Sequence, residues 1–316
     1  MRRAVLIYNP ASGLQWNHRA SVIDDALEVL RQAGVEAEAV ATSGPGSAAT
    51  LAEQHIAAGC DTVLACGGDG TVHEVLQGMV GGEAALGVLP LGTANALAMN
   101  LGLPLSPAKA AQMLLTADRV RISVGQITYQ NGKGRPSSRY FTVAAGIGAD
   151  AHLMYRLDAQ LKRRFGYALY AVEGLKVLAT HAFPLFEAAF TTRTENKPRV
   201  EAVSQLLAVR IRNFGGMLHN LAPGATLHNE SLRLVAFKTR SRFDYMRFLA
   251  AVVGKRHTFN GKIELLDAIS AECNANNGSS DRVFVEADGE LLGGLPARIE
   301  IVPDALTMLI PPQAQI

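Results

Sequence analysis

The chain has 316 residues, enough for two domains that each bury a core, and 48% of its residues are hydrophobic while 18% are charged. This composition excludes an intrinsically disordered protein, and a formal net charge of +2 gives no general attraction to nucleic acid. The three cysteines, Cys60, Cys66 and Cys273, exclude a disulfide framework and a zinc finger, so we expect a reducing compartment.

Membrane-spanning and secretory segments are not expected. No apolar run reaches the roughly 18 residues that a spanning helix needs. The opening MRRAVLIYNP has a short apolar core and no cleavage site, unlike a signal peptide. We therefore expect a cytoplasmic protein whose membrane contact is peripheral, at the inner membrane face.

Strands and helices alternate in the first part of the chain. Short apolar or β-prone segments predict strands at 4–8, 35–41, 61–66 and 85–89. Alanine and leucine at helical spacing predict helices at 17–33, 47–59 and 106–117. This alternation predicts an α/β domain, residues 1–120, with a mostly parallel sheet in three layers and ligand loops at the carboxyl ends of its strands.

The pattern becomes β-rich in the second part of the chain. Alternating or apolar segments predict strands at 119–128, 139–145, 200–211, 231–238, 282–287 and 297–302. Helical patterns interrupt them near 151–180 and 241–253. We expect a second domain, residues 121–316, built as a β-sandwich whose last residues return to the first domain.

The stretch CGGDGTVHE at 66–74 follows an apolar strand and begins a helical pattern. Successive glycines expose backbone amides and a helix amino end carries partial positive charge, so this pattern favours phosphate. A Walker A loop is excluded because no Lys-Ser/Thr pair follows the last glycine. Asp69 would repel phosphate, so we expect a metal ion or a donor hydroxyl beside it. The alternative is a tight turn in which Asp69 is the N-cap residue.

Three further loops follow strands of the same predicted sheet, at Asn9–Gly13, Thr42–Ser47 and Leu91–Asn95. They are rich in glycine, serine, threonine and asparagine, and each alone is consistent with an ordinary turn. The carboxyl ends of parallel strands meet at one edge of a sheet. The four loops together therefore predict a lining for a polyphosphate.

Several motifs together resemble the diacylglycerol kinase catalytic superfamily, most of all its soluble bacterial lipid kinases. They are NPASG, GGDGT followed by Glu74, LGTAN, GIGAD at 146–150 and ADGE at 287–290. GGDGT is the most specific of them, although NAD kinases and phosphofructokinases share a related GGDG. The resemblance implies an ATP site in a first domain of NAD kinase and phosphofructokinase type, a β-sandwich second domain, and a cleft between them for a lipid hydroxyl.

The resemblance also assigns roles to individual residues. The nucleotide contacts it implies are Asn9, Pro10, Ala11, Ser12, Gly13, Thr42, Gly67, Gly68, Asp69, Gly70, Thr71, Val72, His73 and Thr93. Phosphoryl transfer to an alcohol needs Mg²⁺ to neutralise charge and a carboxylate to accept the hydroxyl proton. We expect Glu290 to be that acceptor, Asp288 to support it or to coordinate metal, and Asp69 to act with the Mg²⁺ of the nucleotide. The alternative for Asp288-Gly289 is a simple hairpin turn.

The chain departs from the family pattern at several positions. Ser123 replaces an aspartate of many relatives, Val143 often replaces an asparagine, and Asn229-Glu230 replaces an Asp-Gly pair of an accessory magnesium loop. A neutral amide binds a hard cation more weakly than a carboxylate does. These changes weaken the expectation of an accessory metal near Thr226, Asn229 and Ser231.

The sequence as a whole predicts an ATP- and Mg²⁺-dependent kinase that phosphorylates a hydroxyl of a membrane lipid, such as diacylglycerol or a sphingoid base, with no nucleic-acid partner. Basic and aromatic residues interleave at 238–256 and suit an anionic membrane surface, although an ordinary helix with a buried stripe is the alternative. Two other functions stay open: a soluble-substrate kinase related to NAD kinase, and a nucleotide-binding regulator that has lost catalysis.

Overall fold

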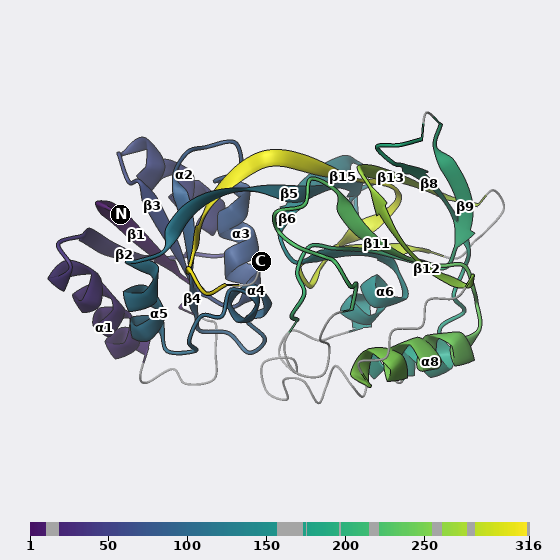
Figure 1. The fold of residues 1–316 in the computed structure, drawn as a ribbon, viewed down its shortest axis with the longest axis horizontal. Coiled ribbons are helices and arrows are strands. Elements are labelled where there is room, and N and C mark those ends of the chain that lie inside the picture. The colour runs from purple at the N-terminus through teal and green to yellow at the C-terminus, as the bar shows by residue number, and fades with distance from the viewer. Residues whose placement is uncertain are drawn as a thin grey trace. The chain divides into compact units, whose positions relative to one another are not determined.

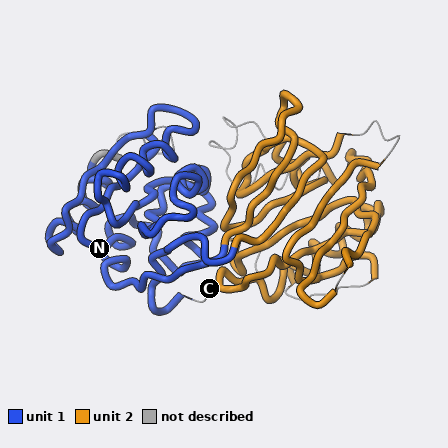
Figure 2. Tube along the Cα trace, turned by 90° about the horizontal axis from the view of Figure 1, so that it is seen from above, with its two compact units in different colours: residues 1–123, 303–316 blue, residues 124–302 orange. Residues whose placement is uncertain are grey.

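The structure is a computed structural model of the chain in which two compact units are distinguished (Figure 2). The first unit contains Met1–Ser123 and Pro303–Ile316, and the second contains Val124–Val302. The structure describes residues 1–10, 19–156, 173–174, 176–195, 197–214, 221–254, 261–276 and 282–314. Two strands, β5 (Asp118–Gln130) and β15 (Glu290–Ile310), contribute residues to both units.

The first unit is built on a parallel sheet with the strand order β2–β1–β3–β4–β15. Its strands are β1 (Arg3–Tyr8), β2 (Glu36–Ala41), β3 (Thr62–Gly67), β4 (Ala85–Pro90) and the end of β15. Every residue of β3 and β4 is buried, as expected for strands that are covered on both faces.

Helices cover both faces of this sheet (Figure 1). On one face α1 (Arg19–Gln32) packs against α5 (Pro107–Leu114), and on the other α2 (Ser47–Ala57) packs against α3 (Asp69–Gln77). A short helix, α4 (Ala96–Asn100), follows β4. The predicted three-layer α/β architecture is therefore confirmed, and the strand boundaries agree within one or two residues.

The register of the strands places their carboxyl ends at one level. Tyr8 at the end of β1 pairs with Ala41 of β2 and with Cys66 of β3, and Gly67 of β3 pairs with Pro90 of β4. The loops after these four strands consequently leave the sheet along one edge.

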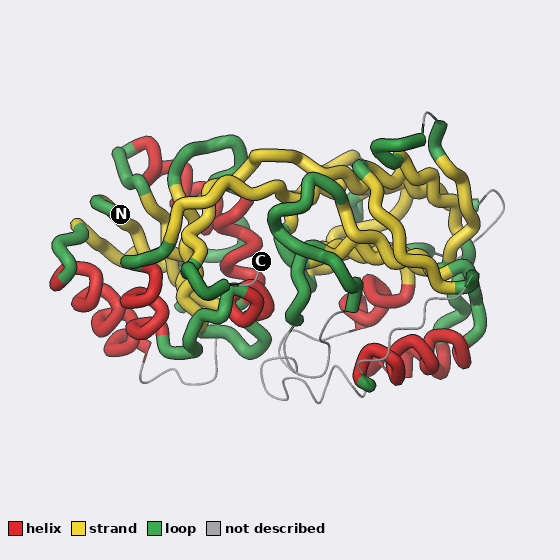
Figure 3. Tube along the Cα trace, viewed as in Figure 1, coloured by secondary structure: helices red, strands yellow, loops and turns green. Residues whose placement is uncertain are grey.

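The second unit consists mainly of strands (Figure 3), which pair with antiparallel neighbours. One path of paired strands runs β12–β11–β10–β7–β14–β15, and others run β9–β8–β13–β15 and β6–β5–β15. The additional strands are β6 (Pro136–Phe141), β7 (Ala144–Gly148), β8 (Phe186–Thr191), β9 (Arg199–Val203), β10 (Gln205–Val209), β11 (Leu232–Phe237), β12 (Ile263–Ala268), β13 (Ser270–Ala275) and β14 (Phe284–Ala287). Apolar side chains from all these paths form one core, which confirms the predicted β-rich sandwich.

The chain turns two corners where single strands were predicted. Residues 139–145 divide between β6 and β7 at Thr142 and Val143, and residues 200–211 divide between β9 and β10 at Ser204. Each corner moves the chain from one ladder to another, because β9 pairs with β8 whereas β10 pairs with β7 and β11. The buried Ser204 fixes its corner with a hydroxyl that contacts the Tyr245 hydroxyl at 2.8 Å. The two single-strand predictions were wrong for this reason.

Two helices of the second unit accompany a smaller apolar cluster. They are α6 (Ala149–Arg156) and α8 (Arg242–Val253), and α8 contributes Tyr245, Phe248 and Val252 to the cluster. The predicted helical pattern near 151–180 lies largely outside the described residues, since 157–172 are not described.

Candidate active site

The loops after β3 and β4 approach each other through two glycines. A Cβ atom on Gly92 would lie 2.3 Å from the Cα of Gly68, and a Cβ on Gly68 would lie 3.1 Å from the Cα of Gly92. Gly92 has no room for a side chain, and Gly68 has little. The close approach keeps this part of the sheet edge lined by backbone, which a phosphate can reach without obstruction.

Asp69 ties these two loops together. Its Oδ1 accepts a hydrogen bond of 2.7 Å from the backbone N–H of Ala96, the first residue of α4. The N-cap of α3 is Gly68, and Asp69 is the first helical residue, so the alternative in which Asp69 caps its own helix is wrong. Its carboxylate instead caps α4, and it adds a negative charge at the sheet edge.

The strained Asn95 completes this arrangement. It has a φ of 50°, in the left-handed region, and its side-chain Oδ1 accepts from the N–H of Gly92 at 2.8 Å while its Nδ2 donates to the Gly92 carbonyl at 2.8 Å. The LGTAN motif therefore forms a closed turn beside Gly68. Sequence reasoning quoted this motif but gave Asn95 no role.

The other predicted nucleotide contacts fall into two groups. Asn9, Pro10, Thr42 and the exposed Thr93 lie at the carboxyl ends of their strands, where an anion could reach them. Thr71, Val72 and His73 are buried residues of α3, and the backbone N–H groups of Thr71 and Val72 donate to the Gly68 carbonyl. Ala11, Ser12 and Gly13 lie outside the described residues.

This edge fits a triphosphate. The first turn of an α-helix carries amides without intrahelical partners, and α3 presents such a turn directly after the glycines. Asp69, at the same place, supplies the type of oxygen ligand that Mg²⁺ prefers. The residues present could therefore hold a nucleotide phosphate together with its metal ion.

The acidic turn belongs to the second unit and is a two-residue hairpin. Asp288 and Gly289 join β14 to β15, with φ values of 48° and 81°, and Ala287 pairs with Glu290 across the turn. Both central residues are thus in the left-handed region that Asp-Gly hairpins use. The predicted hairpin alternative is confirmed as a description of the backbone, and the half-buried Glu290 is the first residue after the turn.

The Asp288 carboxylate is held by three consecutive backbone amides. Its Oδ2 accepts from Thr142 at 3.1 Å, and its Oδ1 accepts from Val143 at 2.9 Å and from Ala144 at 3.0 Å. These amides lie at the corner between β6 and β7, where the ladder cannot satisfy them. Asp288 therefore fastens the turn to this corner and fixes the position of Glu290.

Two further acidic residues near the turn were missed. Glu286 is buried in β14, and its Oε2 accepts from the N–H of Gly289 at 2.9 Å. Asp150 folds back over β7, because a Cβ on Gly146 would lie 1.6 Å from its Oδ2, and burial raises the pKa of the Asp150 carboxyl. Gly146 is the register partner of Glu286, so the two acids lie near each other. A buried glutamate within the apolar run VFVEA was the signal that could have indicated this cluster.

The predicted accessory metal site does not fit a metal. Thr226, Asn229 and Ser231 lie in the loop before β11, and the guanidinium of Arg210 donates to the carbonyl oxygens of Asn229 and Ser231 at 2.8 Å each. The side chain of Asn229 is turned into the loop, where its Nδ2 donates to the Gly224 carbonyl at 3.1 Å. A positive group already occupies the place where these carbonyls converge.

Another group of potential metal ligands lies in the first unit. Ligand atoms of Glu38, His55 and Cys60 lie within 4.8 Å of one another, and His55 Nδ1 is 3.1 Å from a Glu38 oxygen. Thiolate and imidazole suit zinc better than magnesium. This group is therefore unrelated to the expected Mg²⁺ of the nucleotide.

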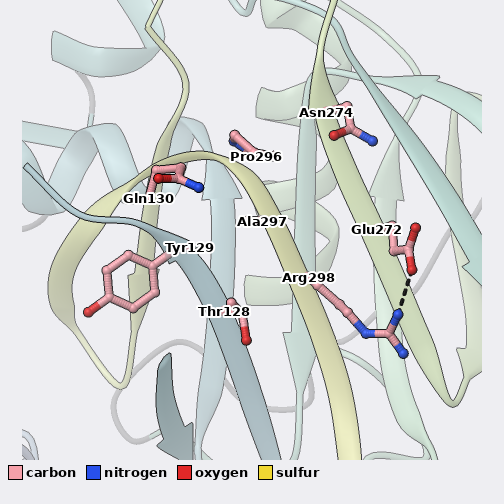
Figure 4. Close-up of a pocket in the computed structure, with 8 residues that line it drawn as sticks. All are labelled: Thr128, Tyr129, Gln130, Glu272, Asn274, Pro296, Ala297 and Arg298. Atoms are coloured by element: carbon pink, nitrogen blue, oxygen red, sulfur yellow. Dashed lines mark hydrogen bonds and ion pairs between the residues drawn. The ribbon is translucent and has the colours of Figure 1, made fainter. Parts of the chain in front are cut away.

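A shallow pocket of about 230 Å³ lies on the second unit (Figure 4). Its rim contains the ion pair between Arg298 and Glu272, which neutralises both charges. The lining residues are Thr128, Tyr129, Gln130, Glu272, Asn274, Pro296, Ala297 and Arg298. They include none of the predicted site residues, so this pocket is not the candidate active site.

Comparisons with known proteins agree with this geometry. Residues 3–127 match the family model of the diacylglycerol kinase catalytic domain, and residues 142–310 match that of the YegS C-terminal NAD kinase beta sandwich-like domain. A diacylglycerol kinase of Bacillus subtilis (strain 168) is 29% identical over 301 residues, which cover 94% of this chain and 92% of that protein. A diacylglycerol kinase of Staphylococcus saprophyticus is 26% identical over 297 residues, which cover 93% and 91%.

Solved structures show the same fold. A crystal structure of a diacylglycerol kinase from Bacillus anthracis str. Sterne superposes with a TM-score of 0.71 at 20% identity and covers 99% of this chain and 98% of that one. The fold and the two family models together define an ATP-using phosphotransferase that acts on an alcohol group. The chain belongs to the diacylglycerol kinase family with a YegS-type C-terminal domain.

Proposed function

We propose that this protein transfers the γ-phosphate of ATP to a hydroxyl group of a membrane lipid, with diacylglycerol or a sphingoid base as the substrate class. The proposal is carried by the glycine-lined edge of the first unit, where Gly68 and Gly92 meet and Asp69 adds a carboxylate. The lipid class is supported by the names of the relatives from Bacillus subtilis and Staphylococcus saprophyticus.

The first unit is assigned to the nucleotide. The backbone around Gly68, Asp69 and Gly70 would bind phosphate, with Asn9, Thr42 and Thr93 at the neighbouring strand ends. Mg²⁺, when bound, would neutralise the charge that develops on the transferred phosphoryl group. Asp69 would hold it through its carboxylate.

The second unit is assigned to proton removal. Glu290 would accept the proton of the lipid hydroxyl as the oxygen attacks the γ-phosphate. Asp288 is a positioning residue in this scheme, because three backbone amides hold both of its oxygens. Its contribution is to orient the turn from which Glu290 projects.

Helix α8 is assigned to peripheral membrane contact. Its inner face packs Tyr245 and Phe248 into the protein, as the buried-stripe alternative expected. A second apolar stripe faces outward, because Phe243, Met246, Leu249 and Val253 are 66%, 47%, 43% and 50% exposed. Exposed Arg240, Arg242 and Arg247 flank it. An apolar stripe beside cationic side chains suits the interface of an anionic bilayer.

No helix among the described residues has the length and apolar character needed to cross a bilayer. Access to a lipid substrate would therefore rest on surface contact such as that of α8. Replacing Phe243 and Leu249 with serine should weaken co-sedimentation with phosphatidylglycerol vesicles, whereas the equally exposed Val200→Ser on β9 should not. Equal binding by all three proteins would overturn the assignment of α8.

The kinase activity is tested with the purified full chain, Mg²⁺ and γ-labelled ATP. Mixed micelles would present diacylglycerol, sphingosine or ceramide, and parallel reactions would contain NAD or other water-soluble alcohols. We expect label in a lipid product only. Label only in a soluble product would identify a relative of NAD kinase, and ATP binding without any transfer would identify a regulator.

A further inference from the structure

The side chain of Arg210 is the largest fully buried side chain among the described residues, with 1% exposure. It follows β10 directly, and its backbone N–H donates to the Val143 carbonyl at 2.9 Å. A charged side chain is rarely buried to this extent without a specific set of partners. The partners of Arg210 therefore indicate what it does.

The guanidinium donates to carbonyl oxygens of alternate residues in one loop. Nη1 donates to Asn229 and Ser231 at 2.8 Å each, and Nη2 donates to Leu227 at 3.0 Å. Carbonyls at alternate positions of a loop point toward a common centre, which is the arrangement by which loops hold a hard cation such as Ca²⁺. Here the cation at that centre is the guanidinium of Arg210.

The charge of Arg210 persists in this position. Burial lowers the pKa of its guanidinium to about 10, which leaves the group protonated at neutral pH. The nearby acids have other partners, since Glu230 pairs with Arg193 at 2.7 Å and Asp267 pairs with Arg233 at 2.6 Å. The three acceptors described above are all backbone carbonyls, a type of oxygen ligand that also binds hard metal ions.

We infer that Arg210 is a built-in replacement for an accessory divalent ion, so that the loop 221–231 is ordered without metal. The substitution is consistent with Asn229, whose neutral side chain donates to Gly224 instead of offering an oxygen to a cation. A carboxylate at position 229 would coordinate a metal ion, whereas a neutral amide suits a loop whose carbonyls already bind a cationic side chain.

This cross-link also supports the cluster beneath α8. Ala222 and Ala225 of the loop are buried in the same apolar cluster as Tyr245, Phe248 and Val252 of α8. Arg210 therefore holds in place the loop on which the helix rests. It follows that this surface is formed at any Mg²⁺ concentration.

The first test uses the unmodified full chain without nucleotide or lipid, so its result is independent of the kinase assignment. Thermal unfolding is recorded in EDTA and across a titration of Mg²⁺ and Ca²⁺ at constant ionic strength. We expect the same unfolding temperature throughout. A saturable rise with either ion that Asn229→Ala abolishes would overturn the inference.

The second test compares two arginines that contact the same loop. Arg210→Met keeps the side-chain volume but removes the charge, and should lower the unfolding temperature by on the order of 10 °C because three buried or part-buried carbonyls lose their donor. Arg233→Met is the control, since Arg233 donates to the Pro223 carbonyl from a partly exposed position. An equal or larger loss for Arg233→Met would contradict a special role for Arg210.

Discussion

We call the residues Gly68, Asp69 and Gly92 of the first unit, which we propose to bind phosphate, the phosphate edge. This edge and the acidic turn of the second unit both join an aspartate to backbone amides, but in different numbers. At the phosphate edge, the Asp69 carboxylate accepts a hydrogen bond from the backbone N–H of Ala96 in α4, and the first turn of α3 directly follows the glycine loop. At the acidic turn, Asp288 accepts from three amides. The first arrangement joins the loops after two strands, whereas the second fastens a hairpin turn to a corner of the sheet. Two aspartates in similar glycine-rich motifs can thus have different tasks.

The largest expected effect comes from Glu290, the first residue after the acidic turn. Glu290→Gln should reduce lipid phosphorylation by about 10²- to 10⁴-fold, because the amide cannot accept the hydroxyl proton. ATP affinity, measured by calorimetry, should stay within about twofold of wild type. A parallel loss of ATP binding would show that Glu290 acts on the structure of the nucleotide site.

Asp69→Asn tests whether the phosphate edge needs a charge. The amide oxygen can still accept from Ala96, so the unfolding free energy should change by less than about 1 kcal/mol. Turnover should fall by roughly tenfold to a hundredfold, because a neutral oxygen is a weaker ligand for Mg²⁺. Turnover equal to wild type at limiting Mg²⁺ would refute the role of Asp69.

Replacing Asp288 with asparagine should reduce the stability of the protein more than Asp69→Asn does. Asp288→Asn keeps one acceptor oxygen but loses part of the set of three amide bonds, so it should destabilise the protein by about 2 kcal/mol in urea unfolding. Activity should fall because Glu290 is misplaced, and Asp288→Glu should restore little of it. If Asp288→Asn is as stable as Asp69→Asn, the contrast between the two regions is lost.

The smallest expected effect concerns charged residues on the surface of the second unit, which form ion pairs with one another. Hydrogen bonds from Arg199 and Lys238 lower the pKa of Glu264 from 4.5 to about 2. Its stabilising contribution is therefore present above about pH 4.5 and is lost as the pH falls toward 2.

Glu264→Gln should cost about 1 kcal/mol at pH 7 after allowance for solvent screening, and the difference from wild type should shrink at pH 3. The exposed Glu187→Gln is the matched control, since Glu187 lies on β8 of the same unit. A difference that stays constant with pH would mean that packing, not charge, is responsible.

The sequence predicted the first unit better than the second for a physical reason. β3 and β4 are buried on both faces, so their residues form uninterrupted apolar runs that end in glycine or proline. The corners at Ser204 and Thr142 lie inside equally regular patterns, and only contacts with residues such as Phe237 and Asp288 turn the chain there. β8, β12 and β13 were missed because their polar residues obscure the alternation.

The sequence also predicted some residues of the candidate site and gave no signal for others. Glycine-rich motifs indicated the phosphate edge because Gly68 and Gly92 must be glycine for local reasons. Arg210 gave no signal, since one arginine at the end of a strand has no periodicity, and its acceptors lie 17 to 21 residues away. The amides that hold Asp288 lie about 145 residues earlier in the chain, and no local pattern could predict these hydrogen bonds.

The return of β15 to the first unit has a consequence for synthesis on the ribosome. Residues Thr307 and Met308 pair with Ala85 and Leu86 of β4, and Arg121 anchors the entering strand through Asp304 at 3.1 Å. Until these residues emerge, nascent β4 presents an unpaired hydrophobic edge, which is the kind of strand that recruits other chains. The first unit is therefore translated first but completed last.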